Sequence, residues 1–162
     1  MAKSADKEEL GDRLVSKNRR AYFNYEVGDS FEAGLSLIGS EARSLRVHGA
    51  DLTDAWVDVD GRHQAWVKGM RIPPLTHAAF GHEERRERKL LLHAAEIEQL
   101  RAATERDGMT VIATKCYFKN GRAKLEIALA RGKKKHDKRQ ALRERAAEDE
   151  ARQAMRRGRG AR

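Results

Sequence analysis

The chain has 162 residues, of which 40% are hydrophobic, a composition that suits one domain with a modest core and a tail. Its formal net charge of +9 is uneven, since residues 131–162 carry 13 Lys or Arg against 5 Asp or Glu, and residues 1–130 carry 21 against 20. The single cysteine, Cys116, excludes an intrachain disulfide and a cysteine zinc cluster, and no apolar run reaches the roughly 20 residues of a membrane-spanning helix. We therefore expect a cytoplasmic protein whose basic tail binds a polyanion: RNA, DNA or an acidic membrane surface.

The first part of the chain changes from polar sequence to strand-like alternation. Residues 1–17 are polar and mixed in charge, so we expect a flexible N-terminal extension. From Tyr22 the apolar residues recur at every second position, and "FEAGLSLIG" predicts a half-buried strand. Ser40 is then predicted to cap a short helix with the sequence "SEARSLR".

Two hairpins and one strong helix follow. "DAWVDVDGRHQAWVKGM" predicts two strands around the turn Asp60-Gly61, and "IPPLTHAAFGHEERRER", which contains both prolines, predicts a surface loop. "KLLLHAAEIEQLRAATERDGM" has helical spacing and predicts a helix that stops near Gly108. "TVIATKCYFKNGRAKLEIALA" contains Asn120-Gly121, the strongest short-range hairpin signal, and we expect Cys116 to be a packed strand residue.

These elements predict a mainly β protein with added helices. Short antiparallel strands around one helix favour a small barrel over residues 18–130, of which the five-stranded OB type is one possible closure. The tail, residues 131–162, contains good helix formers but only a narrow, mostly alanine stripe. We expect the tail to be disordered alone and helical when bound to a surface.

The sequence offers little for metal binding or catalysis. Its histidines lie in separate segments without ligand spacing, and neither a serine elbow nor a phosphate loop is present. Asp54, Asp58 and Asp60 lie close together and leave a magnesium-dependent nuclease as an alternative to solvated surface acids. We expect no metal, no cofactor and no catalytic residue.

Other residues could contact nucleic acid. The Trp and Tyr side chains could stack on bases, although aromatic residues in strands are more often part of a core. "RRERK", residues 85–89, is a second basic cluster; it could be a solvated loop, but its position beside the main helix favours phosphate contacts on a fixed scaffold.

Several segments together resemble one family. "NRRA", "FEAGLSLIGSEARSLR", "RKLLLH" and "YFKNGRAKLEIALARGKKKHDKR" resemble the small protein B family, the SsrA-binding proteins that accompany transfer-messenger RNA, in order from about Asn18 to Arg145. The resemblance implies an OB-like barrel that binds the tRNA-like end of that RNA in place of an anticodon arm, and a tail that binds the ribosome. It also implies a monomer that acts with the small ribosomal subunit and elongation factor Tu.

The resemblance selects site residues in the body. Glu32, Leu91 and Lys124 match positions at which the family contacts its RNA, and Arg19 and Arg20 of "NRRA" lie where it makes further contacts. A carboxylate can accept hydrogen bonds from base or backbone donors, a leucine can pack on a base or sugar, and a lysine can pair with phosphate.

The resemblance also selects residues of the tail. Gly132 matches the family position where the chain turns away from the body, and His136 matches a position that stacks on a decoding-centre base. "DKR", residues 137–139, matches a triplet needed for tag addition. Beyond these residues the family tail is helical in the empty messenger RNA channel. The predicted ribosome-binding residues are Gly132, Lys133, Lys134, His136, Asp137, Lys138 and Arg139.

One departure from the family and two rival functions remain. Relatives usually have a histidine where this chain has Phe23, so this chain lacks that hydrogen-bond donor to RNA. A general ribosomal or assembly protein with a basic tail is the first rival. It would bind ribosomal RNA in every subunit, whereas the second, a nuclease, would need magnesium.

Overall fold

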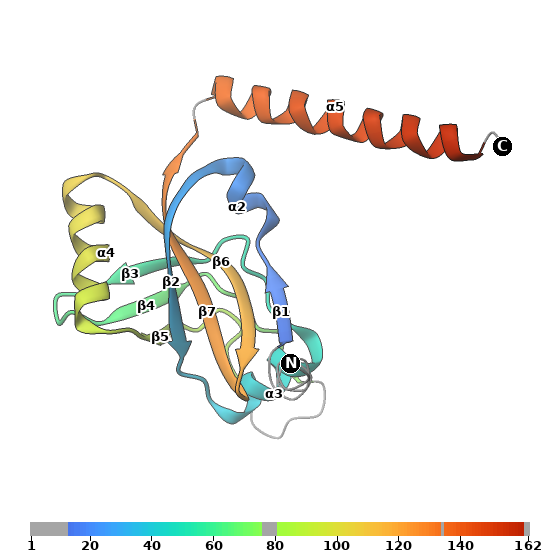
Figure 1. The fold of residues 1–162 in the computed structure, drawn as a ribbon. Coiled ribbons are helices and arrows are strands. Elements are labelled where there is room, and N and C mark those ends of the chain that lie inside the picture. Colours follow the sequence, from blue (N-terminus) through green and yellow to red (C-terminus); the bar gives the residue numbers. More distant parts are fainter. Residues whose placement is uncertain (1–12, 76–80, 134, 161–162) are drawn as a thin grey trace, which may run out of the picture.

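The computed structural model describes residues 13–75, 81–133 and 135–160, of which 135–137 and 159–160 are described by their backbone only. It consists of a sheet that curves on itself, helices packed around it, and one long helix that leaves the body (Figure 1). The elements in chain order are β1 (Arg13–Lys17), α2 (Arg19–Asn24), β2 (Tyr25–Leu35), α3 (Gly39–His48), β3 (Trp56–Val59), β4 (Ala65–Lys68), β5 (Arg88–Leu91), α4 (Ala94–Arg106), β6 (Thr110–Lys119), β7 (Arg122–Gly132) and α5 (Lys135–Gly160).

The strand pairings close into a ring. All of them are antiparallel, and they run from β6 through β3, β4, β5, β2 and β7 back to β6, while β1 pairs with residues 115–118 of β6, apart from Ile112, where β3 pairs. Each member of the ring thus has a partner strand on both sides, an arrangement by which small barrels limit exposed strand edges. The expectation of a mainly antiparallel β fold with added helices is confirmed, and the OB topology stays a prediction.

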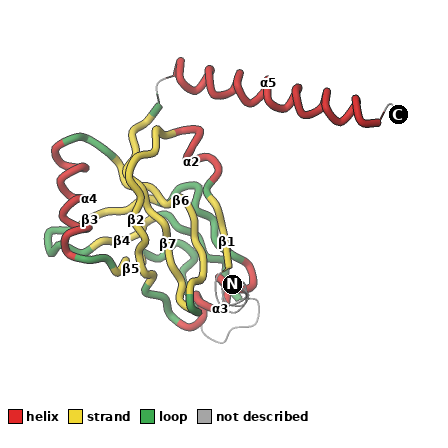
Figure 2. Tube along the Cα trace, viewed as in Figure 1, coloured by secondary structure: helices red, strands yellow, loops and turns green. Residues whose placement is uncertain are grey.

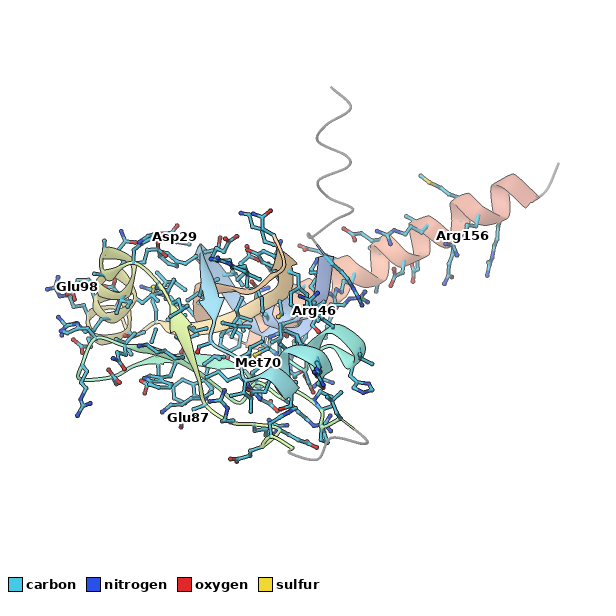
Figure 3. All side chains as sticks on the ribbon, turned by 90° about the horizontal axis from the view of Figure 1, so that it is seen from below. Asp29, Arg46, Met70, Glu87, Glu98 and Arg156 are labelled. Carbon is cyan, nitrogen blue, oxygen red and sulfur yellow. The ribbon has the colours of Figure 1, made fainter. Side chains whose placement is uncertain are left out.

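Alternation along the strands fills the interior. Val57, Val67, Leu90 and Leu125 point inward and are at most 4% exposed. Figure 3 shows Met70 within the body, where its side chain is fully buried, and Arg156 on α5 away from it. The outward positions of the same strands are therefore available for a site.

Helix α4 covers one side of the barrel. It buries Ile97, Leu100 and Ala103, which recur at helical spacing and point toward the sheet. The helix begins at Ala94 rather than at Lys89, because "RKLL" forms β5 between β4 and β2. The predicted helix therefore exists but is shorter, since sheet pairing overrides the local apolar period.

Both predicted hairpins are present. Asn120 and Gly121 have φ values of +52° and +76°, and they connect Lys119 to its pairing partner Arg122. In the β3–β4 loop, an Asp60 carboxylate oxygen accepts hydrogen bonds from the backbone amides of Arg62 at 2.9 Å and Gln64 at 3.0 Å. Cys116, as expected, is a buried strand residue, and burial raises its pKa to about 12.

Helix α3 is capped differently from the prediction. Ser40 makes no capping bond; instead the Glu41 carboxylate accepts a hydrogen bond from the Ile38 amide at 3.1 Å. The same carboxylate, fully buried, forms ion pairs with Arg86 at 2.5 Å and with the fully buried Arg88 of β5. This network connects α3 to the sheet.

The N-terminal part of the body differs from the sequence prediction. Residues 13–17, which we assigned to the flexible extension, form β1, so the folded body includes them, and residues 1–12 lie outside the described ranges. Helix α2 was also missed. Asn18 caps it, accepting from the Ala21 amide at 3.2 Å, and donates to the carbonyls of Leu52 at 2.9 Å and Ala113 at 3.0 Å. The two carbonyls are distant in sequence from Asn18, so local propensity could not reveal these contacts.

The predicted tail starts two residues too early, since Arg131 and Gly132 still belong to β7; residues 135–160 form α5, which extends away from the barrel (Figure 2). Its larger apolar side chains are exposed, Leu142 by 53% and Met155 by 73%. The helical form of the tail is therefore confirmed, and its disorder in the free protein stays a prediction. None of the helices in the described ranges combines the length and apolar composition needed to cross a bilayer.

Candidate nucleic-acid interface

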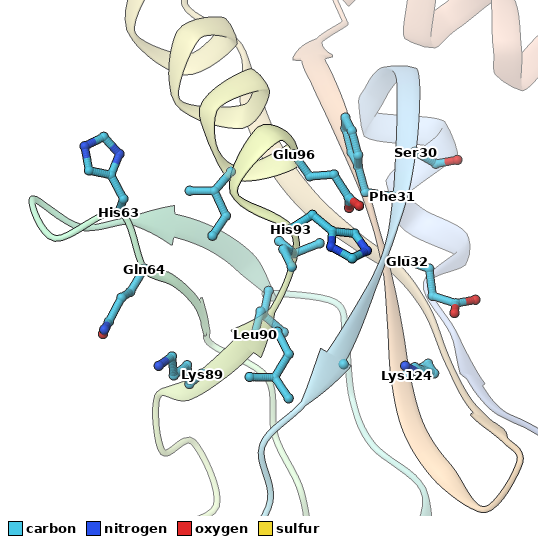
Figure 4. A pocket seen from close by; sticks show the side chains of 14 residues that line it. Ser30, Phe31, Glu32, His63, Gln64, Lys89, Leu90, His93, Glu96 and Lys124 are labelled. Atoms are coloured by element: carbon cyan, nitrogen blue, oxygen red, sulfur yellow. The ribbon is translucent and has the colours of Figure 1, made fainter.

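A groove of about 830 Å³ lies between β2, β5, β7 and the start of α4 (Figure 4). It contains Glu32, Leu91 and Lys124, three residues that are far apart in sequence and that the family resemblance selected as RNA contacts. Further polar side chains along it are those of Ser30, His63, Gln64, Lys89, His93 and Glu96. We call this site the Glu32 groove.

Strand register builds the floor of the Glu32 groove. Gly34 pairs with Lys124 of β7 on one side and with Leu91 of β5 on the other. A Cβ atom at position 34 would lie 3.2 Å from the Leu91 Cβ, closer than side chains normally pack. Glycine therefore keeps the floor low between a cation and a leucine that is 58% exposed.

Glu32 is held by two side chains of β6. The Tyr117 hydroxyl donates a hydrogen bond to Glu32 Oε2, and Lys119 Nζ lies 3.4 Å from the same oxygen. The hydrogen bond from Tyr117 lowers the pKa of Glu32, and the charges of Lys119 and Lys124 act in the same direction, against partial burial. At neutral pH the groove thus presents an oriented carboxylate beside the Lys124 cation.

Comparison with known proteins assigns the chain to a family independently of the structure. The family model described as SmpB protein matches residues 15–157. The chain belongs to the SmpB family.

Relatives and a solved structure agree with this assignment. The SsrA-binding protein of Sorangium cellulosum is 50% identical over 147 residues, covering 91% of this chain and 90% of the relative. That of Oleidesulfovibrio alaskensis is 46% identical over 150 residues, covering 92% and 96%. A chain of the solved structure "tmRNA-SmpB: a journey to the center of the bacterial ribosome" matches with a TM-score of 0.64 and 35% identity, covering 80% of this chain and 94% of that chain.

Sequence reasoning missed Tyr117 and Lys119 in this SmpB-family site. Both alternate along β6 with the buried Cys116 and Phe118, so they point outward. The Asn120-Gly121 turn fixes the register in which Tyr117 faces Lys124. Combining that turn with the alternation would have found them.

Arg19 and Arg20 do not line the Glu32 groove. They are exposed on α2, at the place where the tail leaves the body. There Lys133 donates from its backbone amide to the Asn24 carbonyl at 3.0 Å and from Nζ to the Tyr22 carbonyl at 2.9 Å. The two arginines are thus near the tail, apart from the other three selected residues.

The remaining predicted tail residues differ in how far the structure describes them. Gly132 ends β7 with open space around it and no left-handed φ, so this conformation does not require a glycine. Lys134 lies outside the described residues, and the side chains of His136 and Asp137 do so too. Lys138 and Arg139 lie in the first turns of α5. Their predicted roles stay predictions.

The basic cluster of residues 85–89 is not a set of free phosphate contacts. Arg88 is fully buried and both Arg86 and Arg88 bind Glu41, while Arg85 lies 3.6 Å from Asp54. Lys89 alone of the cluster lines the Glu32 groove. The phosphate interpretation was wrong for Arg88, because an interior carboxylate far away in sequence takes its charge.

Each of the three aspartates of the nuclease alternative has a partner in the fold, and that of Asp54 is Arg85. Asp58 lies 3.1 Å from Lys68 Nζ, and Asp60 accepts from Trp66 Nε1 at 3.0 Å in addition to its two backbone donors. Over the residues whose side chains are described, no three His, Cys, Asp or Glu side chains come together as a metal site.

The tryptophans lie outside the Glu32 groove. Trp56 is 43% exposed, with Lys68 Nζ 5.3 Å from its ring centroid, and Trp66 is half-buried. Of the two, Trp56 is the more exposed.

Proposed function

We propose that this SmpB-family chain is a non-enzymatic RNA-binding factor of ribosome rescue by trans-translation, and that its Glu32 groove binds the tRNA-like domain of transfer-messenger RNA. The observation that carries the proposal is the convergence of Glu32, Leu91 and Lys124 in one groove. The names of the relatives and of the matching structure support the choice of RNA.

The groove has the chemistry that folded RNA requires. Ionised Glu32 can accept hydrogen bonds from a base edge or a ribose hydroxyl, and Lys124 can pair with a phosphate. The exposed Leu91 beside the low Gly34 floor gives an unstacked base or a sugar an apolar surface. Contacts to base edges and sugars provide selectivity, and contacts to phosphates provide affinity.

The tail completes the proposed function. We infer that α5 enters the decoding centre and the vacant messenger RNA channel, where its cations meet phosphates and His136 stacks on a base. The proposed partners are the charged RNA, elongation factor Tu and the small ribosomal subunit, and the protein acts as a monomer in the cytoplasm, where translation takes place.

Binding to the isolated tRNA-like domain and to an ordinary tRNA, over a salt series, tests the proposal. We expect the full chain to prefer the tRNA-like domain, and Glu32→Gln and Lys124→Gln each to weaken that binding about tenfold, as expected for the loss of a charged contact of about 1.4 kcal/mol. The matched controls are Glu105→Gln and Arg106→Gln at the exposed end of α4. Equal affinity for both RNAs, unchanged by the groove variants, would mean nonspecific polycation binding and would refute the proposal.

A further inference from the structure

One cross-strand row connects the Glu32 groove with the opposite edge of the sheet. Each member of the row is the register partner of the next, across five strands. In order from β1 to β5 the row is Leu14, Tyr117, Lys124, Gly34 and Leu91. Because neighbouring strands lie about 4.8 Å apart, the row is a surface path of roughly 19 Å.

The β1 end of this row has a depression of its own. It has a volume of about 500 Å³, and its lining includes Arg13, Leu14, Lys17, Lys115, Tyr117 and Lys119, which together we call the β1 depression. Glu32 lines both the β1 depression and the Glu32 groove. The two sites are therefore neighbours across one side chain.

The charges of the β1 depression favour a polyanion. Lys115 lies 3.4 Å from Glu126, and Lys119 lies 3.4 Å from Glu32, so each carboxylate of the lining already has a cation. Among the described residues, Arg13 and Lys17 have no ion-pair partner. Four cations against two carboxylates leave a net positive surface.

The depression also offers an apolar contact. Leu14 is 57% exposed and lies directly across from Tyr117. The Tyr117 hydroxyl donates a hydrogen bond to Glu32, while the ring remains partly accessible. An aromatic ring beside phosphate-binding cations is the arrangement that binds single-stranded nucleic acid.

We propose that the β1 depression is a second contact site for the RNA that occupies the Glu32 groove, and that it takes backbone phosphates and one unpaired base of the segment beyond Glu32. This inference rests on the proposed function. The continuous row and the shared Glu32 favour one RNA over a separate acidic protein, because a strand that leaves the groove past Glu32 reaches these cations next.

The test uses the full chain with Lys17→Gln combined with Lys115→Gln, and the tRNA-like domain of transfer-messenger RNA as the probe. Each lysine–phosphate contact contributes about 0.7 to the slope of log affinity against log salt for single strands, so we expect a slope lower by about 1.4 and an affinity about tenfold weaker at low salt. The matched control, Arg106→Gln combined with Arg85→Gln, also removes one cation with an ion pair and one without, and leaves the slope unchanged.

A second measurement does not depend on affinity. A photocrosslinking amino acid at position 14 should crosslink to the RNA, whereas the same group at position 47, where Val47 is 70% exposed on α3, should not. If the lysine variant keeps the normal slope and position 14 gives no RNA crosslink, while Lys124→Gln still weakens binding, the second site is refuted and the groove stands. If Lys124→Gln also has no effect, the proposed function itself fails.

Discussion

Glu32 is the residue on which the site depends, because it lines both the Glu32 groove and the β1 depression, and because two side chains of β6 fix one of its oxygens. Tyr117 and Lys119 both contact Oε2, so Oε1 is the oxygen left for a ligand. The charged groups that line the surface with it include Lys115 and Lys119 on β6, and Arg122, Lys124 and Glu126 on β7. A carboxylate in this position is useful to the site only while it is ionised.

Replacing Tyr117 by phenylalanine should therefore change the titration of Glu32. The Tyr117 hydrogen bond is the largest cause that lowers the pKa of Glu32, so Tyr117→Phe should raise that pKa toward its ordinary value of 4.5. Because the folded-state pKa of Glu32 is lowered, its ionised carboxylate stabilises the folded state at neutral pH. This stabilisation is lost as the pH falls through the folded-state pKa.

An NMR titration of the Glu32 side-chain carboxyl carbon from pH 7 to pH 2.5 checks this prediction. Tyr22→Phe serves as the control, since Tyr22 is 46% exposed on α2 and away from Glu32. Superimposable titration curves for the wild-type chain and Tyr117→Phe would show that the hydroxyl does not stabilise the ionised carboxylate.

At the scale of elements, the position of β5 decides the shape of the Glu32 groove. Leu91 and Lys89 reach the groove only because β5 is inserted between β4 and β2. The buried pair between Arg88 of β5 and Glu41 of α3 fixes this strand against the helix, and Arg88 also donates to the Met70 carbonyl at 2.8 Å. Without this ion pair, the four residues of β5 would hold the strand only weakly in its place between β4 and β2.

Glu41→Gln should therefore destabilise the fold strongly. The change leaves the fully buried Arg88 guanidinium without its counter-charge, and breaking a buried pair in this way costs about 3 kcal/mol or more in the free energy of unfolding. Glu84→Gln removes a partner of Arg71 in a pair whose side chains are each 40% exposed, and it should cost less than about 1 kcal/mol. Urea unfolding followed by circular dichroism measures both, and equal losses for the two variants would contradict the assigned role of Glu41.

At the scale of the whole molecule, the chain has a barrel that carries the site and a helical tail that leaves from the opposite end of β7. The connection is short, and Lys133 fixes it by two hydrogen bonds to the last turn of α2. Helix α2 in turn is capped by the buried Asn18. The direction of the tail is thus tied to the body through α2.

Lys133→Met should loosen this connection. The variant keeps the backbone hydrogen bond to Asn24 but loses the Nζ hydrogen bond to the Tyr22 carbonyl. The distribution of distances between spin labels at positions 47 and 142 should therefore broaden in a double electron–electron resonance measurement. Lys138→Met, inside α5, is the control and should leave the distribution as in the wild-type chain. A distribution that Lys133→Met does not alter would mean that the side chain has no part in orienting the tail.

The sequence by itself determined the strands with clear alternation, the Asn120-Gly121 hairpin and the existence of α4, because each follows from periods and turn residues within about 20 positions, and it indicated a helix-forming tail through residue propensity. Its family resemblance also selected the three residues that meet in the Glu32 groove. Only the tertiary structure decided that residues 13–17 join the sheet, that "RKLL" is a strand and that Arg88 is an interior charge. It also decided that Tyr117 and Lys119 hold Glu32. Each of these depends on a partner more than 20 positions away, and local sequence carries no information about which distant strand or carboxylate will be adjacent.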